Sequence, residues 1–524
     1  MKGKWSRFVG IAGIGALLAF ASNSGCGSNS DSKFGGSSSG NSGGSSGAGS
    51  SSGNSGSSGG SCLTCGDGGS GSGGDASMIV CPQGLQCNVQ CSGGTTTTIS
   101  GKVYDPAKKN PLYNVAVYVP QNALQPLPPG VPTGADACSC AALFKSGAVV
   151  SAATGVDGTF KLENAPVGSA VPLVLQIGKW RRLVTIDVKS CQDNPQADKS
   201  LALPGTVAAG DTNDNMPDIA VSTGSADTLE CLMTRIGLPI SEYVAGAAGT
   251  GHVHVFAGGG GNGLAGSPET PGMANAPPSD TSLWDSQAHL MPYDITLLSC
   301  EGGETYDAKP QILEDYLNAG GRVFASHYHY AWFTNPAESG QTYTPPADWG
   351  NNLASWTIGS NGGAQSNGKI VQTLNGSTQP FVKGQALQQW LGLVNALGVL
   401  NAPAMELPII PPRYNAMVGP GNKPSQSWIN DDTTGNAMYF SFDTPVNAMP
   451  QPDGGPPNYC GRAVFSGLHV GGETTPPDSM SPPMGCQQAD LSPQEKALEF
   501  MLFDLSSCVI PDTQPPSDAG VPVQ

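Results

Sequence analysis

Residues 291–333 read MPYDITLLSCEGGETYDAKPQILEDYLNAGGRVFASHYHYAWF, and this stretch decides the fold of the chain. Its first part, residues 294–299, is almost continuously apolar, as is typical of a strand buried on both faces of a parallel sheet. A helix is predicted to begin at Pro310, because the first helical turn tolerates proline, and to end at Gly320. A second strand is predicted at residues 322–326. The stretch therefore indicates one strand–helix–strand unit.

Reactive side chains stand directly after both of these strands. Cys300 and Glu301 follow the first strand, and His327 and His329 follow the second. A crossover through a helix makes the strands parallel, so their carboxyl ends meet at one edge of the sheet. Ligands of open α/β sheets gather at that edge. These four side chains are the first candidates for chemistry.

Other segments extend the same architecture. Ser225 is the predicted N-cap of a helix at residues 229–236. His252 and His254 lie on one face of a short predicted strand. The predicted additional strands are at residues 218–221, 252–256, 437–442 and 462–466.

The remaining C-terminal segments are less regular. Residues 334–430 are interpreted as an irregular, proline-rich insertion that holds one helix near residues 387–394. Ser492 and Glu495 form a capping box that predicts the start of the last helix. The proline-rich end after Cys508 is expected to be disordered.

Composition restricts the class of protein. The chain has 524 residues, too many for a single core, so several domains are expected. Its formal net charge of -17 argues against a nucleic-acid partner, because phosphate binding requires a basic surface. Only 12% of the residues are charged, and 73 are glycine, which is typical of a loop-rich extracytoplasmic protein.

The N-terminus predicts export. Basic residues followed by a short apolar run form a signal peptide over residues 1–25. Cys26 resembles the acylated cysteine of bacterial lipoproteins, although Asn23 replaces the usual aliphatic residue; cleavage after Ala21 would instead leave Cys26 a plain thiol. Residues 26–95 are interpreted as a disordered Gly/Ser-rich linker with a Cys-rich segment. The expected location is the outer membrane or the cell surface, through a lipid anchor.

Fourteen cysteines in an exported chain indicate disulfide bonds. Cys138 or Cys140 is expected to pair with Cys191. Cys231 and Cys300 are the candidates for an unpaired thiol, because each lies on a predicted core element. In the Cys-rich segment zinc is conceivable, but without a nearby histidine disulfides are favoured. That segment contains Cys62, Cys65, Cys81, Cys87 and Cys91.

Residues 96–192 consist of short strands separated by turns, which predicts a small antiparallel β-sandwich. The segment resembles the carboxypeptidase regulatory-like, transthyretin-like modules of bacterial surface proteins. The resemblance implies a fold and no peptidase activity. It is carried by Ser100-Gly-Lys-Val, Asn114-Val-Ala-Val, Asp157-Gly-Thr-Phe and Ala165-Pro-Val-Gly.

Residues 215–509 resemble a second family. Segments 293–303, 320–327 and 461–469, with their Gly-Arg-Val-Phe and Gly-Arg-Ala-Val-Phe strands, look like the trehalose-utilisation (ThuA-like) branch of the class I glutamine amidotransferase-like superfamily. The resemblance implies an α/β domain with a flavodoxin-like parallel sheet and a large insertion. The overall expectation is a multidomain chain with a small β-sandwich, this α/β domain and a disordered tail at residues 510–524.

The ThuA-like resemblance also implies a location for a site. Amidotransferases have a nucleophilic cysteine where this chain has His327, so a glutaminase mechanism lacks its thiolate. His469 and Glu473 lie near the positions of the family's histidine and glutamate. Cys300 lies one strand earlier and could act as a nucleophile only if a histidine came within hydrogen-bonding reach.

Three functions are compatible with these features. The first is a non-catalytic envelope protein that binds a glycan, an envelope component or a protein partner. The second is a ThuA-like enzyme acting on a carbohydrate, with His327 and His469 as acid and base and Glu301 or Glu473 orienting one of them. The third is a transition-metal site formed by His327, His329 and His469, with Glu301, His252 or His254 as further ligands.

Overall fold

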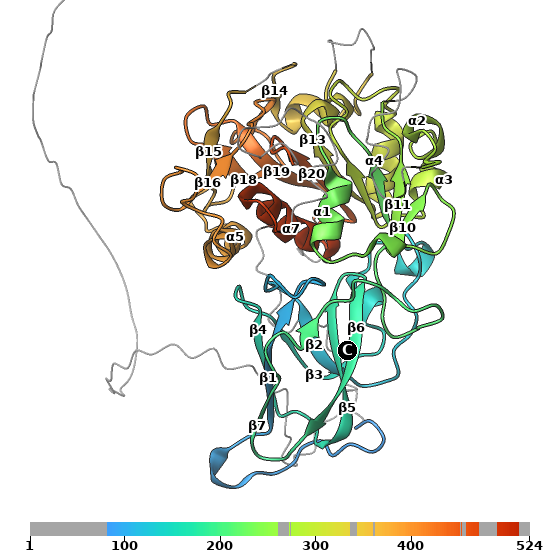
Figure 1. Ribbon diagram of the computed structural model, residues 1–524, viewed down its shortest axis with the longest axis vertical. Helices are drawn as coiled ribbons and strands as arrows, with labels where there is room; N and C mark the ends of the chain where they lie inside the picture. Colours follow the sequence, from blue (N-terminus) through green and yellow to red (C-terminus); the bar gives the residue numbers. More distant parts are fainter. Residues whose placement is uncertain are drawn as a thin grey trace, which may run out of the picture. The chain divides into compact units, whose positions relative to one another are not determined.

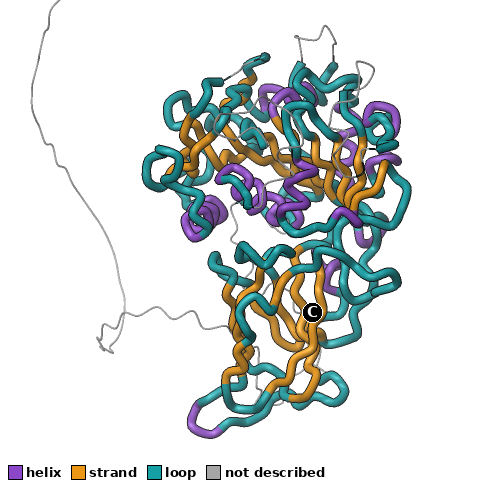
Figure 2. The backbone as a smooth tube through the Cα atoms, in the orientation of Figure 1, coloured by secondary structure: helices purple, strands orange, loops and turns teal. Residues whose placement is uncertain are grey.

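The computed structural model contains a β region and an α/β region, both within one compact unit that spans Asp75–Gln524. The structure describes residues 81–259, 272, 274–335, 343–359, 362–450, 452, 457–470 and 490–512. The signal peptide, Cys26, Cys62, Cys65 and Glu473 lie outside these residues. The described chain is rich in strands, which form several sheets (Figures 1 and 2). No helix among the described residues is long and apolar enough to cross a membrane.

Two four-stranded sheets make up the β region. One has the order β4-β1-β7 with β8 also paired to β1, and the other has the order β3-β2-β5-β6. Pairing is antiparallel except for β7 and β8, which run parallel to β1. The strands are β1 (Thr98–Tyr104), β2 (Ala116–Pro120), β3 (Ala148–Ala153), β4 (Thr159–Glu163), β5 (Gly168–Ile177), β6 (Trp180–Val188), β7 (Asp193–Pro195) and β8 (Leu201–Ala202).

The two sheets share one hydrophobic cluster. Ile99 of β1 and Leu162 of β4 belong to the same buried cluster as Val117 of β2 and Leu173 of β5. The turn between β3 and β4 contains Asp157-Gly158, and Gly158 adopts φ 77°, a left-handed conformation that glycine favours. Strands β1 to β6 lie within residues 96–192, where the sequence predicted short strands, whereas β7 and β8 lie beyond that segment.

A ten-stranded sheet organises the α/β region, with the order β10-β11-β9-β12-β13-β20-β19-β18-β15-β16. The six strands from β10 to β20 in this order are parallel. The last four are antiparallel additions. The strands are β9 (Ile219–Ser222), β10 (Tyr243–Ala245), β11 (Val253–Phe256), β12 (Ile295–Leu298), β13 (Arg322–Ser326), β15 (Ser366–Ile370), β16 (Glu406–Ile409), β18 (Gln426–Asp431), β19 (Ala437–Thr444) and β20 (Gly461–Ser466).

Helices cover both faces of the central strands. In β12, Ile295 and Leu297 belong to a hydrophobic cluster with helices α1, α5 and α7, whereas Leu298 belongs to a second cluster with α4. Phe324 and Ala325 of β13 divide in the same way. This two-sided burial explains the continuous apolar run in the sequence. The α-helices are α1 (Leu229–Arg235), α2 (Ser279–Ser282), α3 (Gln287–Leu290), α4 (Pro310–Ala319), α5 (Val382–Leu393) and α7 (Pro493–Ser506).

Short segments complete the inventory of elements. β14 (Ser355–Trp356) pairs with β17 (Ala416–Met417) in a separate two-stranded sheet. The 3₁₀ helices are η1 (Ser92–Gly94), η2 (Gly134–Asp136), η3 (Cys140–Phe144), η4 (Ile240–Glu242), η6 (His327–Trp332) and η7 (Gly350–Asn352).

Three sequence expectations need correction. The insertion at residues 334–430 is not merely irregular, because it contributes β15, β16 and β18 to the main sheet. Ser225 is not the N-cap of α1; that position is Thr228, and the Ser225 hydroxyl donates to the Glu301 carbonyl. The tail is not disordered from residue 510, because Asp512 accepts a hydrogen bond from Arg462 at 3.0 Å. By contrast, the capping box that begins α7 is confirmed.

The disulfide pairing also differs from the expectation. Cys191 pairs with Cys91 instead of Cys138 or Cys140. Cys231 is disulfide-bonded, whereas Cys300 is a free thiol, as predicted. Two further bonds, Cys138–Cys460 and Cys140–Cys508, join the β region to the α/β region. Another, Cys81–Cys87, closes a short loop. These four bonds indicate an oxidising, extracytoplasmic environment.

A buried carboxyl pair lies where the two regions meet. Glu499 of α7 accepts a hydrogen bond from Asn110 at 2.7 Å, and its carboxyl group contacts that of Asp105. Burial raises the pKa of Glu499 well above its ordinary value, and the charge of Asp105 acts in the same direction. Burial also raises the pKa of Asp105, although Lys109 partly offsets this. The pair is therefore stable when it holds a proton.

We expect the double staple, defined as Cys138–Cys460 and Cys140–Cys508, to dominate the covalent stabilisation of the fold. If one of the two bonds is kept, replacing both cysteines of the other by serine opens a loop of about 50 residues and should lower the free energy of unfolding by about 4 kcal/mol. Replacing all four cysteines by serine should lower it by about 10 kcal/mol. Urea unfolding measures both values. The control is Cys81→Ser with Cys87→Ser, which should cost about 2 kcal/mol; equal losses in all variants would contradict the expectation.

The carboxyl pair predicts a stability that depends on pH. Because the folded-state pKa values are raised, the contribution is fully present below the unfolded values of about 4 and is lost as pH rises through the folded values. Glu499→Gln should remove this loss, because the amide can donate to Asp105 without a proton from solvent. Urea unfolding between pH 4 and pH 8 tests this. If the free energy of unfolding changed with pH in the same way in the wild type and in Glu499→Gln, the carboxyl pair would not be the cause of the pH dependence.

Candidate functional site

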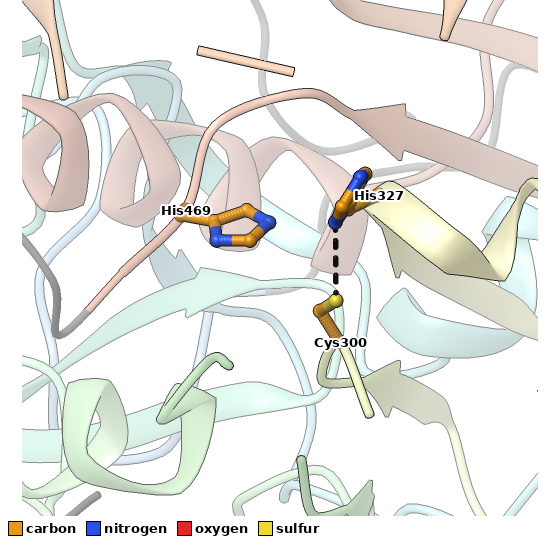
Figure 3. Close-up of side chains that lie close together, drawn as sticks. All are labelled: Cys300, His327 and His469. Carbon is orange, nitrogen blue, oxygen red and sulfur yellow. Dashed lines mark hydrogen bonds between the residues drawn. The ribbon is translucent and has the colours of Figure 1, made fainter. Parts of the chain in front are cut away.

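Three side chains converge at the carboxyl edge of the parallel strands. Cys300 follows β12, His327 follows β13 directly, and His469 follows β20. These strands are neighbours, and their registers pair Leu298 with Ala325 and Ser326 with Ser466. The chain must therefore place the residues after each strand at one edge. Figure 3 shows the thiol and the two imidazoles lying together, as the sequence predicted.

The cluster is tight and buried. Cys300 Sγ lies 3.3 Å from His327 Nδ1, and the ring centroids of His327 and His469 are 4.9 Å apart. One ligand atom from each of the three residues lies within 4.8 Å of the others. The exposed fractions of Cys300, His327 and His469 are 0%, 2% and 2%. Such a geometry allows a proton to pass between thiol and imidazole, or one metal ion to contact all three.

His327 occupies a strained backbone position. It begins η6 directly after β13 and has φ 44°, in the left-handed region that residues with a side chain rarely adopt. Conformations of this kind cost of order 1–3 kcal/mol and are found at sites where the surrounding structure enforces them. Here the sharp turn from strand to helix places the imidazole above Cys300 of the neighbouring strand.

Asp227 holds the ends of the strands together, and the sequence analysis missed it. Its carboxylate accepts hydrogen bonds from the backbone N–H of Cys300 at 3.2 Å and of Val470 at 3.0 Å. It also accepts from the Ser326 hydroxyl, and its Oδ1 lies 3.7 Å from His469 Nδ1. Burial raises the pKa of Asp227 to about 6, while these hydrogen bonds lower it, so the group is mainly ionised at neutral pH. The only sequence signal was an acidic residue between a predicted strand and helix.

Burial keeps the cluster largely neutral. It raises the pKa of the Cys300 thiol, and the carboxylate of Asp227 raises it further. Burial lowers the pKa of His469 well below its ordinary value, and the positive charge of Arg413 acts in the same direction. The thiol is therefore protonated and the His469 imidazole uncharged at neutral pH. A thiolate would form here only beside a strong cation such as a metal ion.

His329, predicted as a metal ligand, has a structural role. Its Nε2 donates to the Ser299 carbonyl at 2.8 Å, and its Nδ1 contacts the Thr305 hydroxyl at 2.6 Å. Burial lowers the pKa of this imidazole to about 4, so it is neutral. Because both ring nitrogens are engaged, His329 is not available to a metal. Its hydrogen bond to the Ser299 carbonyl instead connects η6 to the end of β12.

Glu301 also lies outside the cluster. Its carboxylate accepts from the backbone N–H groups of Tyr306 and Gly259, on the side of β11. Burial raises the pKa of Glu301 to about 7. The residue therefore neither completes the three-residue cluster nor orients His327. Glu473, predicted for the same role, lies outside the described residues.

His252 and His254 are remote from the cluster along the strand direction. His252 precedes β11, and its Nδ1 lies 2.6 Å from the Glu242 carboxylate. His254 Nδ1 lies 2.8 Å from the Gly246 carbonyl. The prediction that they could add ligands at the carboxyl edge is wrong, because His252 lies at the amino end of its strand and His254 is within it.

Comparison with known protein families, with curated proteins and with solved structures finds no match to this chain. The site is therefore interpreted from its own geometry.

We expect Asp227 to be essential to the folded strand ends. Asp227→Ala would leave two backbone N–H groups and a buried hydroxyl without their acceptor, at a cost of about 3–5 kcal/mol. Urea unfolding measures the loss. Asp490→Asn is the control, because this exposed carboxylate pairs with Lys109 at the surface and its change should leave the free energy of unfolding nearly unchanged. A variant Asp227→Ala as stable as the control would disprove this role.

Proposed function

We propose that the protein is an exported envelope protein whose α/β region holds a transition-metal ion, with Cys300, His327 and His469 as ligands. The observation that carries the proposal is that a thiol and two imidazoles, all buried, bring their ligand atoms within 4.8 Å of one another. No other group of three or more such side chains is found among the described residues. The segments after three different strands supply this set, and its outermost members, Cys300 and His469, are 169 residues apart in sequence.

The donor atoms fit zinc or a related metal. Thiolate sulfur and imidazole nitrogen are the ligands that zinc prefers, at about 2.3 and 2.0 Å, and tetrahedral geometry then separates sulfur from nitrogen by about 3.5 Å. The distance from Cys300 Sγ to His327 Nδ1, 3.3 Å, is close to this value. Three protein ligands leave one position open, as in zinc sites that bind a substrate or water.

A buried nitrogen atom without a hydrogen-bond partner among the described residues also supports a metal site. His469 Nε2 is buried and has no hydrogen-bond partner among the described residues. An imidazole nitrogen without a partner loses free energy in a dry site, and a metal ion would recover it. Asp227, 3.7 Å from the other nitrogen of this ring, is placed to act as the outer carboxylate that metal-bound histidines commonly have.

The strand order supports a fold and a family for the α/β region. Counting β9, β11, β12, β13 and β20 along the chain, the parallel strands have the order 2-1-3-4-5, which is the flavodoxin-like order. We infer a flavodoxin-like domain related to the ThuA-like branch, preceded by a regulatory-like β-sandwich. We also propose that lipid on Cys26 anchors the protein to the outer membrane or cell surface.

A thiol–imidazole enzyme is the second candidate. The hydrogen bond between Cys300 and His327 and the sharp turn at His327 favour it, because nucleophile and base must lie within such reach. The raised pKa of Cys300 weighs against it, since the thiolate is the reactive form. Two other functions remain predictions. One is an enzyme that uses His327 and His469 as acid and base, and the other is a non-catalytic protein that binds a glycan or a partner.

Metal analysis tests the proposal. The full chain, purified without a polyhistidine tag, should retain about one equivalent of zinc or cobalt after dialysis. Cys300→Ala and His469→Ala should each weaken binding more than about 100-fold, because a lost ligand costs more than a lost outer partner. His289→Ala is the matched control, since His289 is exposed and pairs with Asp285. Retention of the metal in the Cys300 and His469 variants, or its absence from the wild type, would exclude this centre.

A further inference from the structure

A cavity lies between the β region and the amino edge of the parallel sheet. Its volume is about 90 Å³. Ile295 and Arg322, which are the first residues of β12 and β13, line it. Cys300, His327 and His469 follow the other ends of the strands. The cavity is therefore separate from the proposed metal centre.

The walls of the cavity are mainly apolar. Pro132 of the β region and Pro217 of the α/β region line it, together with all four cysteines of the double staple. The two disulfides thus close the space between the regions. The volume exceeds the roughly 10–15 Å³ that one water molecule requires and is smaller than the roughly 300 Å³ of pockets for drug-sized ligands. It suits a molecule with a few carbon atoms.

Three of the four charged side chains that line the cavity have ion-pair partners. Lys179 Nζ lies 2.6 Å from Asp294 Oδ1, and Asp136 Oδ2 lies 2.6 Å from Lys145 Nζ. The fourth charged side chain is that of Arg322, which makes no ion pair with a described residue. One positive charge at the cavity therefore lacks a carboxylate partner in the described chain.

Carbonyl groups hold the guanidinium of Arg322 in place. Its Nη1 donates to the carbonyls of Gly320 at 2.6 Å and Cys460 at 2.7 Å, and its Nε donates to that of Leu505 at 3.2 Å. These acceptors are neutral. The remaining nitrogen, Nη2, makes no hydrogen bond with a described residue and is not one of the buried polar atoms that lack a partner, so it reaches open space. Its N–H groups are available to a ligand in the cavity.

The surroundings of Arg322 favour an anion. Burial lowers the pKa of Arg322 to about 10, and the positive charge of Arg462 acts in the same direction. The guanidinium is still charged at neutral pH. An anion that accepted hydrogen bonds from Nη2 would offset both the burial of this charge and the repulsion.

We propose that this cavity binds a small monocarboxylate with a short apolar chain. The carboxylate accepts hydrogen bonds from Arg322 Nη2, and the chain lies against the apolar walls and the disulfides of the double staple. One carboxylate balances the one unpaired charge, whereas phosphate would bring excess charge and no apolar part to bury. A ligand here contacts both regions, so its binding stabilises the folded chain.

Calorimetric titration of the full chain with propionate tests the inference. Propionamide is the control ligand, because it has nearly the same shape without the charge. The wild type should bind propionate at least about 10-fold more tightly than propionamide, since hydrogen bonds to charged groups are the stronger ones. Inorganic phosphate should also bind more weakly than propionate. Equal affinity for propionate and propionamide, tighter binding of phosphate, or no binding of propionate overturns the inference.

Variants of the arginine test its role. Arg322→Gln should weaken propionate binding by about 10- to 100-fold, and Arg322→Lys should weaken it less, because lysine keeps the charge. Circular dichroism checks that each variant is folded. Arg182→Gln is the matched control, since Arg182 lies in the β region and pairs with Asp214, and it should leave the affinity unchanged. Unchanged affinity in folded Arg322→Gln overturns the inference, and if that variant does not fold, Arg322→Lys and the propionamide comparison decide it.

A titration after treatment with a metal chelator distinguishes this site from the metal centre. A carboxylate can also bind at an open position of a metal ion. Propionate should bind equally well before and after chelation if it occupies the cavity beside Arg322. Loss of propionate binding together with the metal would place the ligand at the carboxyl edge of the sheet and overturn the inference.

Discussion

The buried carboxylate of Asp227 is the interaction on which the candidate site depends. The strands that carry Cys300, His327 and His469 end at the same edge, and their last N–H groups would lack acceptors there. Asp227 accepts from the segments after β12 and β20 and from the Ser326 side chain at the end of β13. The cost of burying this charge is offset by those bonds. The same group fixes where the three reactive side chains stand.

Much of the fold could be predicted because local pattern and tertiary environment agree. The apolar run of β12 and the capping box of α7 each have one structural solution. The antiparallel extension could not be predicted, because β15 reads Ser-Asn-Gly-Lys-Ile and lacks an alternating pattern. The disulfide pairing could not be predicted either, because the spacing of cysteines along the chain does not determine which of them meet in space.

The site was predictable to the extent that topology determines it. Parallel neighbours had to bring the residues after each strand to one edge, which placed Cys300, His327 and His469 together. The sequence could not show that His327 and not His329 joins the cluster, because the outcome depends on which side chain finds hydrogen-bond acceptors inside the core. Asp227 was missed for a related reason. It belongs to no motif, and its importance comes from contacts with distant segments.

The double staple has a consequence for how the protein matures. Cys138 and Cys140 are separated by one residue, yet their partners are 322 and 368 positions further along the chain. Synthesis runs from the amino end, so both thiols wait unpaired while most of the polypeptide is made. During that interval they can be captured by earlier cysteines. The double staple can therefore close only after residues 460 and 508 have been made, and the β region expressed alone would keep Cys81–Cys87 and Cys91–Cys191 but lack the partners of Cys138 and Cys140.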